Sequence, residues 1–329
     1  MITMTELAKL AGVSQPTVSR VLNGNTSVNP EVAKKVMACA KKYNYQPNMI
    51  ARSLNGSKTC LLAVIVPNIA NPFFADIIQR IENEAGKSGY SILIFNSDYN
   101  QEKERKYLAL LQQYRVDGLL LAPVHTDEES IRPFRKLTIP WMIITNRVEN
   151  VDSVYISHEK AGKMVAGHMI SIGVEKYVFI GKKSDKKFIG FEKGLTDGNV
   201  NTREALTVFW EKDREKMLEL MVEYLKEIPE RAGIFTTNDM DALVVMNALM
   251  GAGIAIPQKA ALVGFDNTFI SKQVLPGITS VNQPIDEMCT FAVNNLLKQI
   301  QGEKQDKIQY TELTADLMIR ESSAETFPT

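Results

Sequence analysis

Residues 3–23 read TMTELAKLAGVSQPTVSRVLN, and this stretch predicts two short helices joined by a tight turn. Thr3 and Glu6 stand three residues apart before an apolar run, which is the spacing of a capping box at a helix start. Gly12 tolerates the left-handed backbone that ends a helix, and Ser14 is suited to cap the next one. The stretch therefore predicts a helix-turn-helix, the motif that lays its second helix in the DNA major groove.

The second of these helices has a predicted inward face and a predicted outward face. Val18, Val21 and Leu22 are spaced to pack inward. Arg20 then faces outward, where its guanidinium can donate two hydrogen bonds to guanine. Gln15 also faces outward, where its amide can pair with the edge of adenine. An ordinary helical hairpin is the alternative interpretation of this stretch when it is taken alone.

A third helix is predicted to complete a three-helix headpiece. Asn29 is suited to cap it, and Pro30 fits its first position because the N–H groups there have no partner inside the helix. Apolar residues spaced by three or four define its predicted inward face: Val32, Val36, Ala40 and Tyr43.

The formal net charge of the 329-residue chain is zero, but the charge is unevenly distributed. Residues 1–59 contain eight Lys or Arg and two Glu, whereas residues 60–329 contain 30 basic and 36 acidic residues. A basic N-terminal part favours a polyanionic partner for that part of the chain.

Several classes of protein are disfavoured by what the sequence lacks. Cys39, Cys60 and Cys289 are odd in number and have no metal-ligand spacing, so we expect free thiols in a reducing cytoplasm. Met1 leads directly into the first helix, which leaves no room for a signal peptide, and no apolar run approaches about 18 residues. We find no Walker loop and no G-x-S-x-G elbow. We therefore expect no catalytic residues, no metal, no cofactor and no membrane span.

Beyond residue 60 the sequence alternates short apolar runs with amphipathic segments, which predicts an α/β fold of doubly wound parallel sheets. The predicted strands cover residues 61–66, 91–95, 118–122, 141–145, 154–156, 177–180, 205–209, 233–236 and 261–264. Helices are expected to begin near Pro72, Glu102, Glu128, Lys160, Phe188, Arg214, Asp241 and Phe269. The pattern starts again near residue 154, so we expect two lobes with a ligand cleft at the carboxyl ends of their strands.

Four segments together resemble the lactose/galactose-repressor (LacI/GalR) family of bacterial transcription factors. They are LAKLAGVSQPTVSRVLNGN at 7–25, YQPNMIARSL at 45–54, VPNIANPFFADI at 66–77 and VGFDN at 263–267. The resemblance implies an all-α helix-turn-helix headpiece and a two-lobed core like that of periplasmic binding proteins. It implies a homodimer that binds a pseudo-palindromic double-stranded operator, usually as a repressor, and responds to a small carbohydrate-type effector.

The resemblance also implies how the chain is divided. The headpiece would cover residues 1–46, a hinge helix and linker 47–60, and the core 61–329. The first lobe would hold 61–156 and 284–312, and the second 157–283 and 313–329. A helix from Pro284 to Gln301 would return to the first lobe. In the hinge helix, Leu54 would wedge between base steps in the minor groove.

Carried over position by position, the resemblance implies two sets of binding residues. The DNA-binding set is Thr3, Thr5, Ser14, Gln15, Pro16, Thr17, Ser19, Arg20, Asn23, Asn29, Tyr45, Asn48, Ala51, Arg52 and Leu54. The effector-binding set is Asn71, Phe73, Phe74, Thr145, Arg147, Ile156, Lys187, Trp210, Asn238 and Asp266. Trp210 would stack on the apolar face of a sugar, and Asn238 and Asp266 would bond its hydroxyls.

Two departures from the family pattern bear on the effector. Lys187 precedes Gly190-Phe191 where the family usually has Arg, and Thr145-Asn146 stand where many relatives have Asp-Arg. Loss of a carboxylate, together with Lys187 and the nearby Lys182, Lys183 and Lys186, favours an anionic effector such as a sugar acid or a sugar phosphate. The alternative is that these lysines are simply solvated.

Three further interpretations remain open from the sequence. The first is a sugar-binding receptor without a DNA role, and the second is a carbohydrate enzyme with a helical cap. The third is a global carbon regulator with a phosphocarrier-protein corepressor. The preferred interpretation is a cytoplasmic, nucleoid-associated regulator, with a dimer favoured over a tetramer.

Overall fold

The computed structural model describes residues 2–22, 28–45, 58–303 and 307–324. It separates into two compact units, Met1–Leu61 and Leu62–Thr329. The predicted hinge helix lies outside the described residues, as do the DNA-binding residues Asn23, Asn48, Ala51, Arg52 and Leu54.

The first unit contains the three predicted helices, α1 (Met4–Ala11), α2 (Gln15–Leu22) and α3 (Pro30–Lys42). The capping box is confirmed, because Thr3 Oγ1 accepts from the Glu6 N–H at 3.2 Å and Glu6 Oε2 accepts from the Thr3 N–H at 2.7 Å. Gly12 ends α1 with a left-handed φ of 67°. These local signals fix the turn that sets the direction of α2.

The core of this unit is formed by fully buried Leu7, Ala11, Val18 and Val36. The prediction that Tyr43 faces inward is wrong, since 40% of this residue is exposed. The helix already ends at Lys42, so the 3.6-residue period no longer applies to Tyr43. Tyr45 packs against the core instead, because the chain folds back and its N–H donates to the carbonyl of Ala40.

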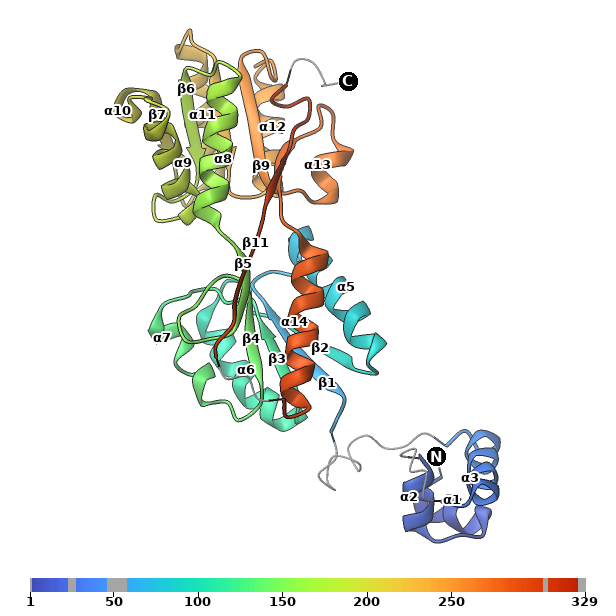
Figure 1. Ribbon diagram of the computed structural model, residues 1–329. Helices are drawn as coiled ribbons and strands as arrows, with labels where there is room; N and C mark the ends of the chain where they lie inside the picture. Colours follow the sequence, from blue (N-terminus) through green and yellow to red (C-terminus); the bar gives the residue numbers. More distant parts are fainter. Residues whose placement is uncertain (1, 23–27, 46–57, 304–306, 325–329) are drawn as a thin grey trace. The chain divides into compact units, whose positions relative to one another are not determined.

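The second unit contains two six-stranded sheets (Figure 1). The first sheet has the order β11-β5-β4-β3-β1-β2. Its strands are β1 (Leu61–Val66), β2 (Ser91–Asn96), β3 (Gly118–Leu121), β4 (Trp141–Thr145), β5 (Ser153–Ile156) and β11 (Tyr310–Leu313). Its helical segments are α5 (Pro72–Lys87), α6 (Gln101–Tyr114), α7 (Glu128–Ile131), the short 3-10 helix Phe134–Lys136 and α14 (Ile285–Ile300).

The second sheet has the order β12-β10-β9-β8-β6-β7. Its strands are β6 (Lys176–Ile180), β7 (Leu206–Phe209), β8 (Ala232–Thr236), β9 (Ala260–Asp266), β10 (Thr279–Asn282) and β12 (Asp316–Met318). Its helices are α8 (His158–Ser171), α9 (Lys186–Asp197), α10 (Thr202–Ala205), α11 (Arg214–Glu227), α12 (Asp239–Gly251) and α13 (Phe269–Gln273). The α/β fold with parallel sheets is confirmed, with β12 as an antiparallel edge on β10.

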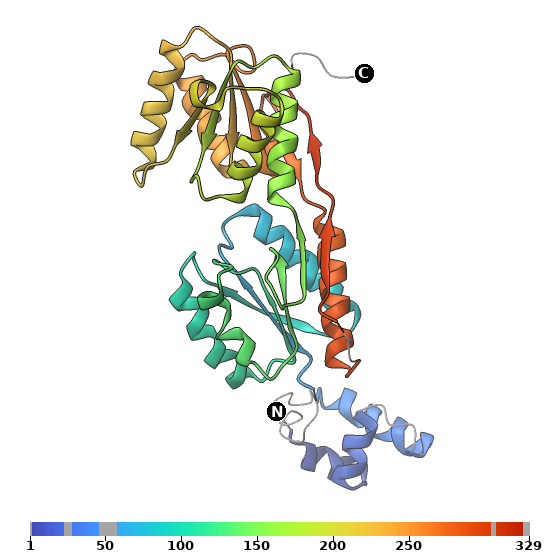
Figure 2. The same cartoon turned by 60° about the vertical axis from the view of Figure 1, so that its left-hand side comes forward.

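The chain passes between the two sheets three times (Figures 1 and 2). It leaves the first sheet after β5, returns from β10 through α14, and crosses once more between β11 and β12. Strand β11 lies parallel to β5 with Leu313 opposite Ile156, so two of the crossings lie side by side. Each sheet is therefore built from separate stretches of the chain.

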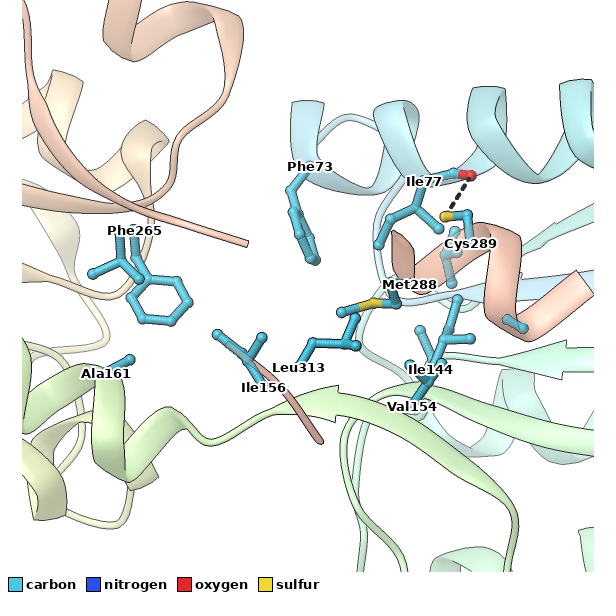
Figure 3. Packing of buried hydrophobic residues seen from close by; sticks show 14 of the residues in the cluster. Phe73, Ile77, Ile144, Val154, Ile156, Ala161, Phe265, Met288, Cys289 and Leu313 are labelled. Carbon is cyan, nitrogen blue, oxygen red and sulfur yellow. Dashed lines mark hydrogen bonds between the residues drawn. The ribbon is translucent and has the colours of Figure 1, made fainter. Parts of the chain in front are cut away.

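One hydrophobic cluster contains buried residues of both sheets and of the crossings (Figure 3). Ile156 and Leu313 lie at the crossings, and Met288 and Cys289 come from α14. The Cys289 thiol donates to the carbonyl of Ile77 at 3.7 Å, so this cysteine is part of the helix packing. Within the described residues, no helix is long and apolar enough to cross a membrane.

Helices α8 and α9 pack closely through glycines. A Cβ atom at Gly190 would lie 2.0 Å from the carbonyl oxygen of Glu159, and one at Gly162 would lie 2.2 Å from that of Lys187. These neighbours are backbone atoms, so they can yield only if the helices separate. The contact therefore sets the position of Lys187 at the start of α9.

We expect Gly190→Ala to lower the free energy of unfolding by about 1–3 kcal/mol, because the added methyl overpacks the helix contact. The matched control is Gly167→Ala on α8, where a Cβ atom meets open space. There the substitution should gain up to about 1 kcal/mol from helix propensity. Urea unfolding of both variants checks the prediction, and equal stability of the two would contradict it.

Candidate functional site

The outward face of α2 exposes the side chains that were predicted to contact DNA. Gln15, Pro16 and Arg20 are exposed, while Thr17 and Ser19 are half-buried. Thr5 Oγ1 of α1 donates to Gln15 Oε1 at 3.4 Å, so the two helices share this surface. A long cation and an amide on one exposed helix face suit the reading of base edges.

Three other predicted DNA-binding residues use their side chains to begin helices. Thr3 caps α1, Asn29 Oδ1 accepts from the Glu31 N–H at 2.9 Å at the start of α3, and Ser14 Oγ contacts Thr17 Oγ1 at 2.8 Å before α2. Tyr45 is half-buried against the headpiece core. Their contacts within the unit are thus structural, and their contact with DNA stays a prediction.

In the second unit, Asp266 lies at the carboxyl end of β9 with a left-handed φ of 99°. It is 6% exposed, and its Oδ1 accepts from Gln283 Nε2 at 2.7 Å. Burial raises the pKa of Asp266 to about 7, with a further contribution from Asp239, whereas Lys187 acts in the opposite direction. The buried Gln283 Oε1 has no hydrogen-bond partner among the described residues. This pair therefore offers a carboxyl group and an amide oxygen to a polar ligand.

Lys187 lies beside this carboxyl group. Its Nζ donates to the carbonyl of Thr237 at 2.7 Å and lies 4.2 Å from the ring centroid of Phe265. The His158 ring is 5.7 Å from the same phenyl ring, and burial and the charge of Lys187 lower the pKa of His158 to about 3. The imidazole is therefore neutral near pH 7.

Asn238 caps α12 next to these groups. Its Oδ1 accepts from the Asp241 N–H at 2.8 Å, and its Nδ2 donates to Asp241 Oδ2 at 2.9 Å. Asp241 also forms an ion pair with Arg214 and accepts from Thr237 Oγ1. The carboxyl ends of β8 and β9 thus carry a dense set of hydrogen-bonding groups.

On the first sheet, Asn71 caps α5 by accepting from the Phe73 N–H at 3.0 Å. Phe73 is 4% exposed and packs edge-on against the half-buried Phe74, with their ring centroids 5.2 Å apart. Phe73 therefore belongs mainly to the hydrophobic cluster, as Figure 3 shows.

Two families of bacterial domains match this chain. Residues 3–48 match the model described as bacterial regulatory proteins, lacI family, and residues 166–323 match the periplasmic binding protein-like domain. Catabolite control protein A of Priestia megaterium is 31% identical over 314 residues, which cover 93% of this chain and 94% of that protein. The chain belongs to the LacI family. As a member of this family it is a DNA-binding transcriptional regulator and not an enzyme.

Two further comparisons extend the family match. The ribose operon repressor of Halalkalibacterium halodurans is 31% identical over 329 residues, covering 98% of this chain and 97% of that protein. Among solved structures, a periplasmic binding protein/LacI transcriptional regulator of Alkaliphilus metalliredigens QYMF, complexed with D-xylulofuranose, is 29% identical with a TM-score of 0.70. That match covers 80% of this chain and 99% of the other.

The effector residues predicted for this LacI-family chain fall into separate places. Thr145 is 5% exposed at the end of β4, and Ile156 is buried at a crossing. Arg147 is exposed, with its guanidinium 4.6 Å from the ring centroid of Tyr310. Both Arg147 and Ile156 line a smaller cavity of about 200 Å³. Trp210 lines another, larger cavity, of about 560 Å³.

Tyr99 and Gln283 are two residues of this region that sequence reasoning missed. Tyr99 lies in the loop between β2 and α6 with a left-handed φ of 54°, and its hydroxyl interacts with Asn71. Burial raises the pKa of Tyr99, and the charges of Asp241 and Asp266 add to this effect. A tyrosine just before a capping asparagine was the available signal for Tyr99. Gln283 was predicted only as the boundary residue before the chain returns to the first lobe.

The carboxyl group of Glu104 in α6 is buried and forms a hydrogen bond with the loop after β3. It is 1% exposed, and its Oε1 accepts from the Val124 N–H at 2.8 Å. Burial raises the pKa of Glu104 to about 7 from a usual value of 4.5. Between pH 4.5 and about pH 7, Glu104 keeps its proton in the folded chain and releases it in the unfolded chain. The contribution of Glu104 to stability is therefore greatest at acid pH and falls as the pH rises from 4.5 to 7.

We expect Glu104→Gln to remove this pH dependence, because the amide stays neutral and can still accept from Val124. At pH 8 the variant should have a free energy of unfolding higher by up to about 3 kcal/mol. Urea unfolding at pH 5 and pH 8 measures the difference, with exposed Glu219→Gln on α11 as the control. An equal pH dependence in wild type and Glu104→Gln would show that Glu104 is not the group responsible.

Proposed function

We propose that this regulator represses carbohydrate-utilisation genes by binding a pseudo-palindromic operator as a homodimer, and that a small carbohydrate-type effector controls it. The observation that carries the proposal is the set of polar groups around Asp266, Lys187 and Asn238 at the strand ends of the second sheet. Buried polar groups are costly unless paired, and a polyol supplies many hydroxyls that can pair with them. On this proposal the protein acts in the cytoplasm, on nucleoid DNA.

The proposed division of the chain follows from the resemblance: headpiece 1–46, hinge helix and linker 47–60, and core 61–329. One helix-turn-helix offers few base contacts, and a twofold pair doubles them. We therefore propose the dimer as the DNA-binding form, with Gln15 and Arg20 as the residues that read base edges.

The choice of a carbohydrate as effector is supported by the names of two similar proteins. One is a repressor of a ribose operon, and the other was solved with D-xylulofuranose. The four lysines that favoured an anionic effector differ in their surroundings, because Lys182, Lys183 and Lys186 are exposed and only Lys187 is half-buried. We therefore propose a sugar, with sugar acids and sugar phosphates as the alternatives to be tested beside it.

A thermal-shift screen of the purified full-length chain against sugars, sugar acids and sugar phosphates tests the proposal. A ligand at 100 times its Kd stabilises the folded state by about 2.7 kcal/mol. Each hit is then added to the complex with selected operator DNA. An inducer lowers DNA affinity and a corepressor raises it, because only a difference in affinity for the two states shifts their populations.

A phosphocarrier-protein corepressor is the alternative, suggested by the similarity to catabolite control protein A. In that case no compound in the screen would shift the melting temperature. A phosphorylated carrier protein would then raise operator affinity when it is added alone.

A further inference from the structure

The turn that follows β9 has an unusual backbone. Asp266 and Asn267 are consecutive and both left-handed, with φ of 99° and 50°. Residues other than glycine adopt this region rarely, and they keep it only where surrounding contacts hold them there. The turn ends at Thr268, the residue before α13. Contacts from outside the turn must therefore fix the direction of the Asp266 carboxyl group.

Asp239, the first residue of α12, binds this turn through both of its carboxyl oxygens. It is 1% exposed, and its Oδ2 accepts from the Thr268 N–H at 2.7 Å and from the Thr268 hydroxyl at 2.9 Å. Its Oδ1 accepts from the Ser280 hydroxyl of β10, and Ser280 Oγ in turn accepts from the Asn267 N–H at 2.9 Å. Asp239 is thereby connected to both residues that follow Asp266.

Arg320, from the segment after β12, contacts the same turn. Its guanidinium donates to Asn267 Oδ1 and to the carbonyl of Ile278, the residue before β10. The Arg320 N–H donates to Thr279 Oγ1 at 2.8 Å, which fixes the main chain of this segment on β10. Asn267 Nδ2 also donates to Asn282 Oδ1 at 2.8 Å, at the other end of β10. The turn is therefore bonded to α12, to β10 and to the segment after β12.

The three hydrogen bonds of Asp239 all lie within the protein, to Thr268 and Ser280. Both of these partners are themselves buried. A buried carboxylate is costly unless it is hydrogen-bonded, and here the bonds that compensate it are those that hold the turn. The position of Asp239 thus suits it to orient the residue that binds the effector, and not to bind the effector itself.

We propose that Asp239 is a positioning residue of the effector site, whose carboxylate holds the turn 266–268 so that the Asp266 carboxyl group is directed at the hydroxyls of the effector. This inference rests on the proposed function, in which Asp266 binds a carbohydrate. It adds the group through which α12 fixes the direction of that carboxyl group.

Calorimetry on the full-length chain measures the effect, with D-ribose, D-xylose, D-glucose, D-gluconate and glucose 6-phosphate as probes. The probe that binds the wild type most tightly is then used with the variants. Asp239→Ala removes all three hydrogen bonds, and we expect it to lower the affinity for that probe about tenfold. Asp239→Asn keeps the shape and an oxygen that can accept from Thr268, so its loss should be only about threefold.

Ser322→Ala is the control for a general loss of stability. Ser322 is fully buried, and its Oγ accepts from the Thr279 N–H at 2.8 Å and donates to the carbonyl of Leu262. Neither contact involves the turn 266–268. This variant should unfold at a lower temperature than the wild type and still bind the probe with wild-type affinity. Circular dichroism gives the temperature range in which every variant is folded, and the titrations are made within it.

A double-mutant cycle tests whether Asp239 acts through Asp266. In the Asp266→Ala background the turn carries no carboxyl group to direct. Adding Asp239→Ala there should change the affinity for the probe by less than about twofold. If Asp239→Ala fails to fold, the same cycle is made with Asp239→Asn, whose threefold loss should likewise disappear in that background.

Wild-type affinity in the folded Asp239 variants would overturn the inference, as would a further loss in the Asp266→Ala background equal to that in the wild type. Either result would leave the proposed carbohydrate effector standing. If none of the probes binds the wild type, the proposed carbohydrate effector fails, and the inference fails with it.

Discussion

Replacing Arg20 with alanine is expected to weaken binding to the operator far more than binding to DNA of unrelated sequence. Arg20 lies on the exposed face of α2, and no described residue forms an ion pair with it. The N–H donors of its planar guanidinium match the two acceptors that guanine presents in the major groove. Loss of such a contact costs about 1–3 kcal/mol of discrimination, and a dimer loses it twice.

The operator is first selected from random DNA, and anisotropy titrations are then made at one fixed salt concentration, because phosphate contacts depend strongly on salt. The matched control is Lys41→Ala, which removes an exposed cation from α3. If Lys41 contacts phosphate, its replacement should weaken binding to both DNAs to a similar extent. If Arg20→Ala lowered the affinity for both DNAs equally, Arg20 would contact phosphate and would not read bases.

The second large effect is expected at Asp266, where alanine should abolish the effector response and leave DNA binding intact. The carboxyl is buried and its partner is Gln283, so its removal leaves that amide without the bond and the ligand without an acceptor. An unpaired buried polar group costs about 1–3 kcal/mol, which reduces effector affinity about 10- to 100-fold. The substituted residue belongs to the second unit and α2 to the first, so base reading should be unaffected.

Operator affinity with and without effector measures this response. Asp266→Asn is a second variant, because asparagine tolerates the left-handed backbone and keeps an oxygen in place. Asp197→Ala, at the exposed end of α9, is the control. A full response in Asp266→Ala would show that the effector binds elsewhere, whereas lost DNA binding would indicate misfolding.

Much of the fold could be predicted because its signals are local. The Thr3/Glu6 spacing defines a helix start, and runs such as 61–66 and 141–145 predict buried strands whose bounds the structure reproduces. Strands β10, β11 and β12 were not predicted, because TSVN, YTEL and DLM are too short to show the alternation of a strand. Strands β11 and β12 form on the edges that β5 and β10 offer them.

The candidate site was harder to predict, because its side chains are defined by long-range packing. Asp266 and Asn238 could be found from their positions after strand ends. Tyr99 precedes the capping Asn100, but that position alone does not indicate a role, because the role depends on a left-handed loop that brings its hydroxyl to Asn71. The burial of Glu104 was also hidden, since a glutamate in an amphipathic helix usually faces solvent.

The three crossings have a consequence for synthesis on the ribosome. Both sheets gain an edge strand from residues 310–318, close to the end of the chain. The first sheet also packs against α14, which is translated only after β6 to β10 of the second sheet. Neither sheet can be completed while most of the chain is being made. Nascent chains that stop before residue 285 would expose the apolar surface that α14 covers, and such surface is a substrate for chaperones.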